Sequence, residues 1–260
     1  MKLPNPATLP ASNSYDCAFS PDGLYLAVSH SVSPFITIYK RGGDTFTKLP
    51  NPAQLPNGTG ISCCFSPNGQ YLAVGHQSTT TRYLTIYKQE GDTFTALPDP
   101  ATALPSQANG LSFSPDSLYL AAAHGTSRFL TIYKRTGDTF GALPNPDILP
   151  PGVTQCCAFS PDGLRLVAAG GSTAAAYILI YKRNGDTFTK LPDIATVPQS
   201  NLRSITFSPG GRYMAVAHFV APGFAVYSRD GDSLVKLPDA VNPIWTGTIN
   251  GQGVAFFTYE

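Results

Sequence analysis

Charged side chains are scarce in this chain. Asp, Glu, Lys and Arg together make up 13% of its 260 residues, and the formal net charge is only +1. A protein that binds the phosphate backbone of nucleic acid, or that adheres to anionic lipid, needs clustered basic side chains. The sequence therefore predicts no nucleic-acid partner.

Long hydrophobic runs are also missing. No segment approaches the roughly 18 consecutive apolar residues that a membrane-spanning helix needs. The N-terminal sequence Met-Lys-Leu-Pro-Asn-Pro lacks the apolar core of a secretory signal peptide. We therefore expect that the protein is made in the cytoplasm and does not insert into a membrane.

Cysteine is rare, and its count of five is odd. All five cysteines fall within predicted strands, so we interpret them as core residues of a protein made in a reducing compartment, without disulfide bonds. No Cys-x-x-Cys motif occurs, and the adjacent pairs Cys63-Cys64 and Cys156-Cys157 project to opposite sides of a strand. We expect no metal site and no cofactor.

What the sequence does contain is a fivefold repeat. The motif Phe-Ser-Pro recurs with its Phe at 19, 65, 113, 159 and 207, at intervals of 46, 48, 46 and 48 residues. Each copy continues through a tight turn, a segment like Tyr-Leu-Ala-Val, an alternating segment that ends in Tyr, a Gly-Asp turn and a proline-bearing link. A fixed period of this length indicates a repeat architecture.

Each repeat contains four short segments with the alternation typical of strands, separated by Asp-Gly, Asn-Gly and Gly-Asp turns. In the first repeat they cover Tyr15–Ser20, Tyr25–His30, Phe35–Lys40 and Thr45–Leu49. Four antiparallel strands per repeat predict an all-β fold, a five-bladed β-propeller that forms a single domain over residues 1–260. The predicted blades cover about residues 15–50, 61–98, 109–144, 155–192 and 203–238.

The amino-acid sequence of the repeat resembles that of a known family. Phe-Ser-Pro-Asp-Gly, followed by Tyr-Leu-Ala-Val and Ile-Thr-Ile-Tyr, looks like the blade of WD-repeat proteins over nearly the whole chain. The resemblance implies a β-propeller. Tyr stands where that family usually has Trp, and the Gly-His before the innermost strand is missing, which implies that the family's hydrogen-bond tetrad is absent. The fuller pattern, with Ile-Tyr-Lys-Arg, Gly-Asp-Thr-Phe and Leu-Pro-Asn-Pro, is similar to WD-like repeat proteins encoded by bacteriophages and prophages.

The two ends of the chain carry partial copies of the repeat. Residues 253–259 match the innermost strand of a sixth repeat, with Phe256 lying 49 residues after Phe207. We expect this extra strand either to close the ring or to pair with a partner chain, which would make a homo-oligomer possible. Its candidate contact residues are Val254, Phe256, Phe257 and Tyr259.

All four histidines occupy one position of the repeat, 11 residues after the motif Phe: His30, His76, His124 and His218. The fourth repeat has Gly170 there. Two interpretations stay open. Either the imidazoles line one rim of the propeller and contact a ligand, or each hydrogen-bonds a backbone carbonyl of its own or the next blade. A shared metal ion is not expected, because these positions should lie on the order of 10 Å apart, whereas zinc needs ligands at about 2 Å.

The loops between the second and third strands vary most from repeat to repeat. An aromatic residue follows most of them, and Arg precedes it in two; these candidate rim residues are Phe35, Tyr83, Phe129, Tyr177, Arg82 and Arg128. A rim of aromatic, hydroxyl and arginine side chains can bind a protein surface or stack on a sugar. The alternative is that the aromatic rings fill space between blades.

Catalytic motifs are not apparent. The Asp residues mostly occupy hairpin turns and recur in every repeat, which favours a structural role. No Gly-x-Ser-x-Gly occurs, and no repeat breaks the pattern with polar residues gathered at the centre. The lysines at the start of the exposed hairpins are interpreted as solvated; they are Lys40, Lys88, Lys134 and Lys182. We therefore predict that the protein is not an enzyme.

Three features together predict a non-enzymatic binding propeller: the low charge, the extra C-terminal strand and the resemblance to phage-encoded repeat proteins. The first expectation is a phage virion or tail-associated component, located in the virion, that docks other protein subunits or a host surface. Two alternatives stay open. One is a lectin-like propeller that binds a surface glycan through one weak site per blade, and the other is an intracellular interaction scaffold in the cytoplasm.

Overall fold

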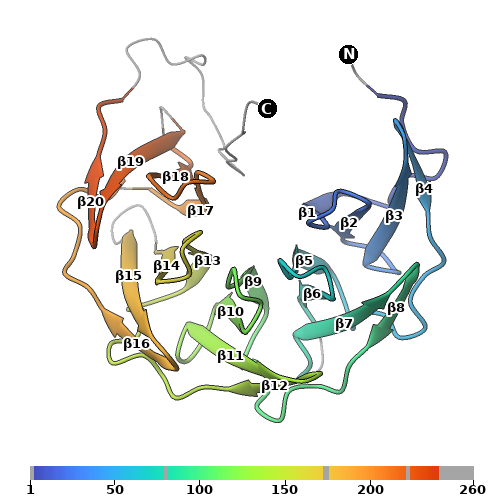
Figure 1. The fold of residues 1–260 in the computed structure, drawn as a ribbon, viewed down its shortest axis with the longest axis horizontal. Helices are drawn as coiled ribbons and strands as arrows, with labels where there is room; N and C mark the ends of the chain where they lie inside the picture. Colours follow the sequence, from blue (N-terminus) through green and yellow to red (C-terminus); the bar gives the residue numbers. More distant parts are fainter. Residues whose placement is uncertain (1–2, 79–80, 172–175, 199, 221–222, 240–260) are drawn as a thin grey trace. The chain divides into compact units, whose positions relative to one another are not determined.

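The computed structural model describes residues 3–78, 81–171, 176–198, 200–220 and 223–239. Within these residues twenty strands form five four-stranded antiparallel sheets, and in each sheet consecutive strands pair in chain order (Figure 1). These sheets are the five blades of a β-propeller, so the predicted fold class is confirmed. No helix in the described ranges has the length and hydropathy to cross a membrane.

The chain divides into two compact units, residues 1–124 with 132–142, and residues 125–131 with 143–260. The first unit holds blades 1 to 3, apart from the start of β11. Blade 1 consists of β1 (Ser14–Phe19), β2 (Tyr25–His30), β3 (Ile36–Gly42) and β4 (Thr45–Lys48). Blade 2 consists of β5 (Gly60–Phe65), β6 (Tyr71–His76), β7 (Leu84–Glu90) and β8 (Thr93–Ala96). Blade 3 consists of β9 (Ala108–Phe113), β10 (Tyr119–His124), β11 (Leu130–Thr136) and β12 (Thr139–Ala142).

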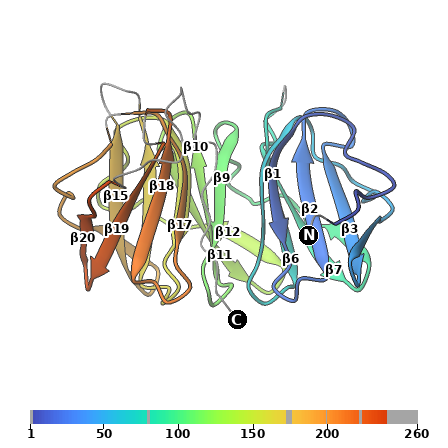
Figure 2. The same cartoon turned by 90° about the horizontal axis from the view of Figure 1, so that it is seen from above.

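The second unit holds blades 4 and 5. Blade 4 consists of β13 (Thr154–Phe159), β14 (Arg165–Gly170), β15 (Tyr177–Asn184) and β16 (Thr187–Lys190). Blade 5 consists of β17 (Leu202–Phe207), β18 (Tyr213–His218), β19 (Phe224–Asp230) and β20 (Ser233–Lys236). The strands of a blade run side by side, as Figure 2 shows for β1, β2 and β3. The predicted extra strand, with Val254, Phe256, Phe257 and Tyr259, lies outside the described residues.

The Phe-Ser-Pro motif closes the first hairpin of each blade. In blade 1 the Ser20 hydroxyl accepts a hydrogen bond from the Tyr25 amide at 2.8 Å and donates one to Asp22 Oδ1 at 2.5 Å. Gly23 follows with a φ of 65°, and Ser117 takes up the same left-handed conformation in blade 3, with a φ of 57°. Each residue of the repeated motif therefore has a fixed place in one turn.

Neighbouring blades of the first unit are joined by a recurring clasp. The Tyr25 hydroxyl of blade 1 donates to Asp92 Oδ1 of blade 2 at 2.6 Å, and the Lys40 ammonium donates to Asp92 Oδ2 at 2.8 Å. The Tyr25 ring packs edge-on against Phe94, with 5.7 Å between ring centroids. Between blades 2 and 3 the same contacts are made by Tyr71, Lys88, Asp138 and Phe140.

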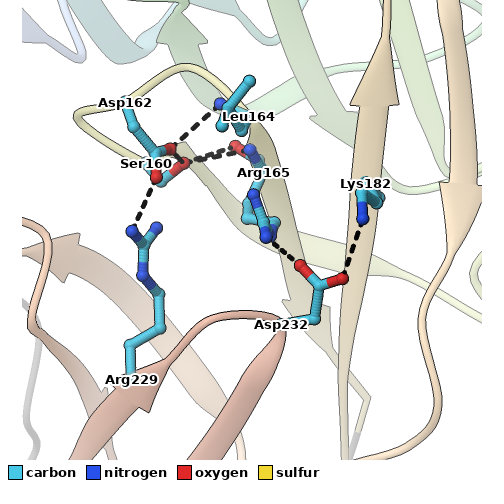
Figure 3. A network of polar contacts seen from close by, with 7 residues as sticks. All are labelled: Ser160, Asp162, Leu164, Arg165, Lys182, Arg229 and Asp232. Atoms are coloured by element: carbon cyan, nitrogen blue, oxygen red, sulfur yellow. Dashed lines mark hydrogen bonds and ion pairs between the residues drawn. The ribbon is translucent and has the colours of Figure 1, made fainter.

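The clasp of the second unit uses a different donor (Figure 3). Arg165 of blade 4 takes the place of the tyrosine and donates to Asp232 Oδ1 of blade 5, while Lys182 donates to Asp232 Oδ2 at 3.0 Å. Leu234 stands where blades 2 and 3 carry the partner Phe. A second ion pair joins Arg229 to Asp162 across the same blades at 2.6 Å.

The clasps correct the interpretation of the hairpin lysines as merely solvated. Lys40, Lys88 and Lys182 each bind the turn Asp of the next blade. These partners lie 50 or more residues apart in the chain, so local sequence patterns do not show the pairing. Behind the clasps the facing sheets bury an apolar layer, in which Ile36 and Leu72 are fully buried.

Candidate functional site

The four histidines that were predicted to line a rim are buried within their blades. They expose 4% of their surface or less: His30, His76, His124 and His218. His30 Nε2 shares a hydrogen bond with the Thr37 hydroxyl at 2.9 Å, and His76 Nε2 shares one with the Thr85 hydroxyl at 3.1 Å. In these two blades the partner of Nε2 is thus a side chain of the next strand, while backbone hydrogen bonds also act on His30 and on His218. This placement gives ligand contact by the imidazoles no support, and that role stays a prediction.

Burial also determines the charge of these imidazoles. It lowers the pKa of His30 and of His218 below the ordinary value. Burial, together with the nearby Arg82 charge, lowers the pKa of His76 to about 4. These three rings are therefore neutral at pH 7 and suited to hydrogen bonding inside a blade.

Blade 4 shows what replaces the His-Thr pair. Gly170 and Leu179 occupy the two positions, and the Tyr177 hydroxyl fills the vacated space. This hydroxyl donates to the Gly152 carbonyl at 2.7 Å and shares a hydrogen bond with the Thr154 hydroxyl at 2.8 Å. Tyr177, one of the predicted rim aromatics, is thus a buried residue of the blade.

Two other predicted rim aromatics hold a left-handed backbone. Phe35 has a φ of 66° and Phe129 a φ of 59°, and Gly223 occupies the same place in blade 5 with a φ of 85°. An aromatic residue in this region is conformationally unfavourable by roughly 1–2 kcal/mol. Both rings are half-buried at the start of the third strand.

The remaining predicted rim residues lie in different surroundings. Arg82 is mostly buried and forms an ion pair with Asp99, with 2.7 Å between Nε and Oδ1. Tyr83 beside it is half-buried, and Arg128 is exposed. The two arginines thus differ in their surroundings, and only Arg82 is held by a carboxylate among the described ion pairs.

One acidic side chain lies on a first strand, away from the turns. The pairing of β1 with β2 has a bulge between Ser14 and Asp16, which leaves Tyr15 unpaired. Asp16 Oδ1 accepts a hydrogen bond from the Cys17 amide at 2.8 Å, and Asp16 Oδ2 accepts one from the Cys63 amide of β5 at 2.9 Å. The carboxylate therefore bridges the first strands of blades 1 and 2, which lie next to each other in the first unit (Figure 1).

The pKa of Asp16 is matched to proton transfer near neutral pH. Burial raises it to about 6, against the lowering effect of the amides of Cys63 and Cys17. A carboxyl group that titrates close to the ambient pH is an effective general base or acid. The neighbouring Cys17 is exposed, but partial desolvation and the Asp16 charge raise the pKa of its thiol, so it is not a thiolate nucleophile.

Asp16 was not among the predicted site residues, because the aspartates were interpreted as turn residues. The signal was its position three residues before the motif Phe, where the other repeats have Ser62, Gly110, Cys156 and Ser204. One repeat does break the pattern with an acidic side chain on a first strand. In the described ranges, no group of three or more His, Cys, Asp or Glu side chains could hold a metal ion.

Comparison with protein families agrees with the repeat pattern. The model of the WD domain, G-beta repeat, matches residues 53–83, which contain β5 and β6. The chain is a WD-repeat-like β-propeller. No curated protein matches it.

Solved structures match nearly the whole chain. A candidate 6-phosphogluconolactonase from Bacteroides uniformis ATCC 8492 is 16% identical with a TM-score of 0.69, over 90% of this chain and 72% of the other. The periplasmic gluconolactonase of Pseudomonas aeruginosa is 16% identical with a TM-score of 0.67, over 88% and 72%. A protein of unknown function from Desulfotomaculum acetoxidans DSM 771 is 14% identical with a TM-score of 0.70, over 89% and 71%. At these identities the likeness shows the fold.

These comparisons contradict the predicted function. A non-enzymatic virion component was expected, but two of the similar structures carry the names of lactone-hydrolysing enzymes, and nothing in the comparisons points to a virion. The prediction that the protein is not an enzyme is wrong on the same finding. The predicted virion role was based on the sequence of the repeat, which indicates how the blades are built rather than what they do.

Proposed function

We propose that this protein is a hydrolase that opens a sugar lactone, with Asp16 as its general base. The observation that carries the proposal is the Asp16 carboxyl, which has a pKa of about 6 and an acidic counterpart in none of the other four repeats. The lactone is suggested by the names of two structures with the same fold. Because one fold hosts many activities, the carboxyl carries more weight than the fold.

The reaction follows ordinary ester hydrolysis. The ionised Asp16 carboxylate takes a proton from a water molecule, whose oxygen bonds to the lactone carbonyl carbon. When the tetrahedral intermediate collapses, the bond between that carbon and the ring oxygen breaks. The proton held by Asp16 passes to the ring oxygen, and the product is the open hydroxy acid. The amides of Cys17 and Cys63 keep the carboxylate oriented throughout.

The test uses glucono-δ-lactone and its 6-phosphate as substrates. Lactone opening is followed by acid release in a pH-stat at pH 7, and the uncatalysed rate is subtracted. The wild-type protein is expected to accelerate at least one lactone, and Asp16→Ser to lose 10²-fold or more of that acceleration, the order typical of a general base. Serine is the matched replacement, because Ser62 and Ser204 hold the same position in blades 2 and 5.

Asp193→Asn serves as the control variant. Asp193 is 77% exposed and pairs only with Lys190 among the described ion pairs, so its loss should leave both the fold and the lactone-opening rate unchanged. Circular dichroism and the melting temperature check that Asp16→Ser folds. An Asp16→Ser protein that opens the lactone as fast as the wild type, or a wild-type protein without acceleration on either substrate, would refute the proposal.

A further inference from the structure

The links that lead into blade 2 and into blade 4 are nearly identical in sequence. The first reads Leu-Pro-Asn-Pro-Ala-Gln-Leu-Pro over residues 49–56, and the second reads Leu-Pro-Asn-Pro-Asp-Ile-Leu-Pro over residues 143–150. In both links the carbonyl of the sixth residue accepts a hydrogen bond of 2.9 Å from a tyrosine on the third strand of the blade. The two links therefore have the same register, and Ala53 corresponds to Asp147.

The link into blade 4 bonds to the outer edge of that blade. The Asp147 amide donates to the Phe188 carbonyl at 3.4 Å, and the Lys190 amide donates to Asp147 Oδ1 at 2.8 Å. Phe188 and Lys190 belong to β16, which is the last strand of its sheet. A last strand presents backbone groups that no further strand can bond. In blade 4 one aspartate of the link satisfies two of these groups.

The outer edge of blade 2 has no such cover. In β8 the Leu97 amide, just past the end of the strand, donates to the Ile86 carbonyl of β7 at 2.8 Å. Because bonding alternates along an antiparallel pair, the Phe94 carbonyl and the Ala96 amide point to the free edge. Among the hydrogen bonds of the described residues none reaches either group, and Ala53 has no side chain that could provide one.

A groove lies along this edge, between β8 and the link into blade 2. Its volume is about 440 Å³, and it is lined by the proline-bearing residues 50–54 on one side and residues 92–96 on the other. All of these residues belong to the first unit. A space of this size is within the range of ligand sites.

The charges around the groove favour a negatively charged ligand. The Lys48 ammonium donates to Oδ1 of Asn51, a groove residue, at 2.8 Å. In blades 4 and 5 the equivalent lysines instead pair with Asp193 and Asp239. Lys48 takes part in none of the ion pairs of the described residues, and the carboxylate of the groove, Asp92, is already bound in the clasp. An acidic ligand would therefore find a cation that lacks a counterion.

We propose that this groove binds an extended acidic peptide, which adds to the edge of β8. The peptide makes the contacts that Asp147 makes in blade 4. Its backbone amide donates to the Phe94 carbonyl, its carboxylate accepts from the Ala96 amide, and Lys48 supplies the countercharge. Backbone bonding selects an extended chain, and the carboxylate selects an acidic one.

The probe is a synthetic peptide with the sequence of the link into blade 4, Leu-Pro-Asn-Pro-Asp-Ile-Leu-Pro, blocked at both ends and labelled with fluorescein. Fluorescence anisotropy follows its binding to the full chain at low salt. Saturable binding is expected. A peptide with Ala in place of Asp should bind roughly tenfold more weakly, because it loses a hydrogen bond between a carboxylate and an amide.

Ala53→Asp places in the groove the residue that blade 4 uses to cover its own edge. This variant should fold, because Asp147 occupies the same position of an equivalent link, and it should bind the peptide roughly tenfold more weakly. Lys48→Ala copies Ala96 of blade 2 and should weaken binding about threefold, with less dependence on salt. The matched control is Lys236→Ala, in blade 5, which should bind like the wild type.

Three results would each overturn the proposal. They are a wild type that does not bind the peptide, an Ala53→Asp protein that binds it as tightly as the wild type, and equal binding of the Asp and Ala peptides. Free N-acetyl-aspartate amide, which has the carboxylate without the extended chain, should not displace the peptide at equal concentration. Displacement would mean a site for small carboxylates instead. No variant changes Asp16, so these results are independent of lactone hydrolysis.

Discussion

Two clasps can be compared, one between blades 1 and 2 and the other between blades 4 and 5. In both the acceptor is the turn Asp of the later blade, but the donor differs. In the first unit the tyrosine ring is buried against Phe94, and its hydroxyl reaches Asp92. In the second unit Arg165 reaches Asp232 with its guanidinium, and the partner Phe has become Leu234. The donor and its apolar partner therefore both differ between the two clasps.

The two clasps differ in the source of their stabilisation, which is burial of a ring in one and compensation of a charge in the other. Tyr25 is 3% exposed and contributes mainly by removing a large ring from water. Arg165 has a side chain that is 10% exposed, so its charge depends on Asp232 for compensation. We therefore expect the first clasp to be sensitive to loss of the ring and the second to be sensitive to loss of the carboxylate.

The largest effect is expected from Tyr25→Ala. Loss of the buried ring leaves a cavity between blades 1 and 2 and should lower the free energy of unfolding by about 3–5 kcal/mol. Tyr25→Phe keeps the ring and loses only the hydrogen bond to Asp92, so it should cost about 1 kcal/mol. Urea unfolding measures both. Equal losses for the two variants would mean that the hydroxyl, and not the ring, holds this clasp.

Asp232→Ala is expected to destabilise more than Asp92→Ala. Removal of Asp232 leaves the Arg165 guanidinium buried without its carboxylate and should cost about 3 kcal/mol. Removal of Asp92 leaves a neutral hydroxyl and the partly exposed Lys40, for which about 1 kcal/mol is expected. The same urea titration compares the two variants, and the reverse order would contradict the distinction between the clasps.

Arg229→Gln should remove a pH-dependent part of the stability of the second unit. Although burial opposes it, Arg229 together with Ser160 lowers the pKa of Asp162 to about 2, from an ordinary 3.8. A lowered folded-state pKa stabilises the protein above pH 3.8, and this stabilisation is lost as the pH falls toward 2. Wild type and variant should therefore differ by about 1 kcal/mol at pH 6 and converge near pH 2. A constant difference across that range would exclude the Asp162 carboxylate as the cause.

The smallest effect is expected from Lys40→Ala. The side chains of Lys40 and Asp92 are 42% and 48% exposed, and exposed ion pairs contribute about 0–1 kcal/mol. The loss should shrink further in 1 M salt, because screening weakens exposed pairs. Thermal unfolding at low and high salt checks this. A loss that salt leaves unchanged would show that the alkyl chain of Lys40, rather than its charge, contributes.

Local patterns predicted the fold because propeller blades are built from short-range features. Strand alternation and tight turns placed the four strands of blade 1 within two residues of their observed ends. The features that were missed depend on neighbouring blades. Lys40 meets Asp92 52 residues later, and Asp16 becomes an unusual carboxyl only because the Cys63 amide and the packed strands surround it. No local pattern carries that information.

The pH dependence of lactone opening tests the central claim most directly. If Asp16 is the general base, its ionised form is the active one. After the uncatalysed rate is subtracted, kcat/KM should therefore rise with pH and level off above an inflection near pH 6. The inflection should be absent from whatever residual rate Asp16→Ser retains. A wild-type profile with no inflection near pH 6, or the same inflection in Asp16→Ser, would contradict the assignment.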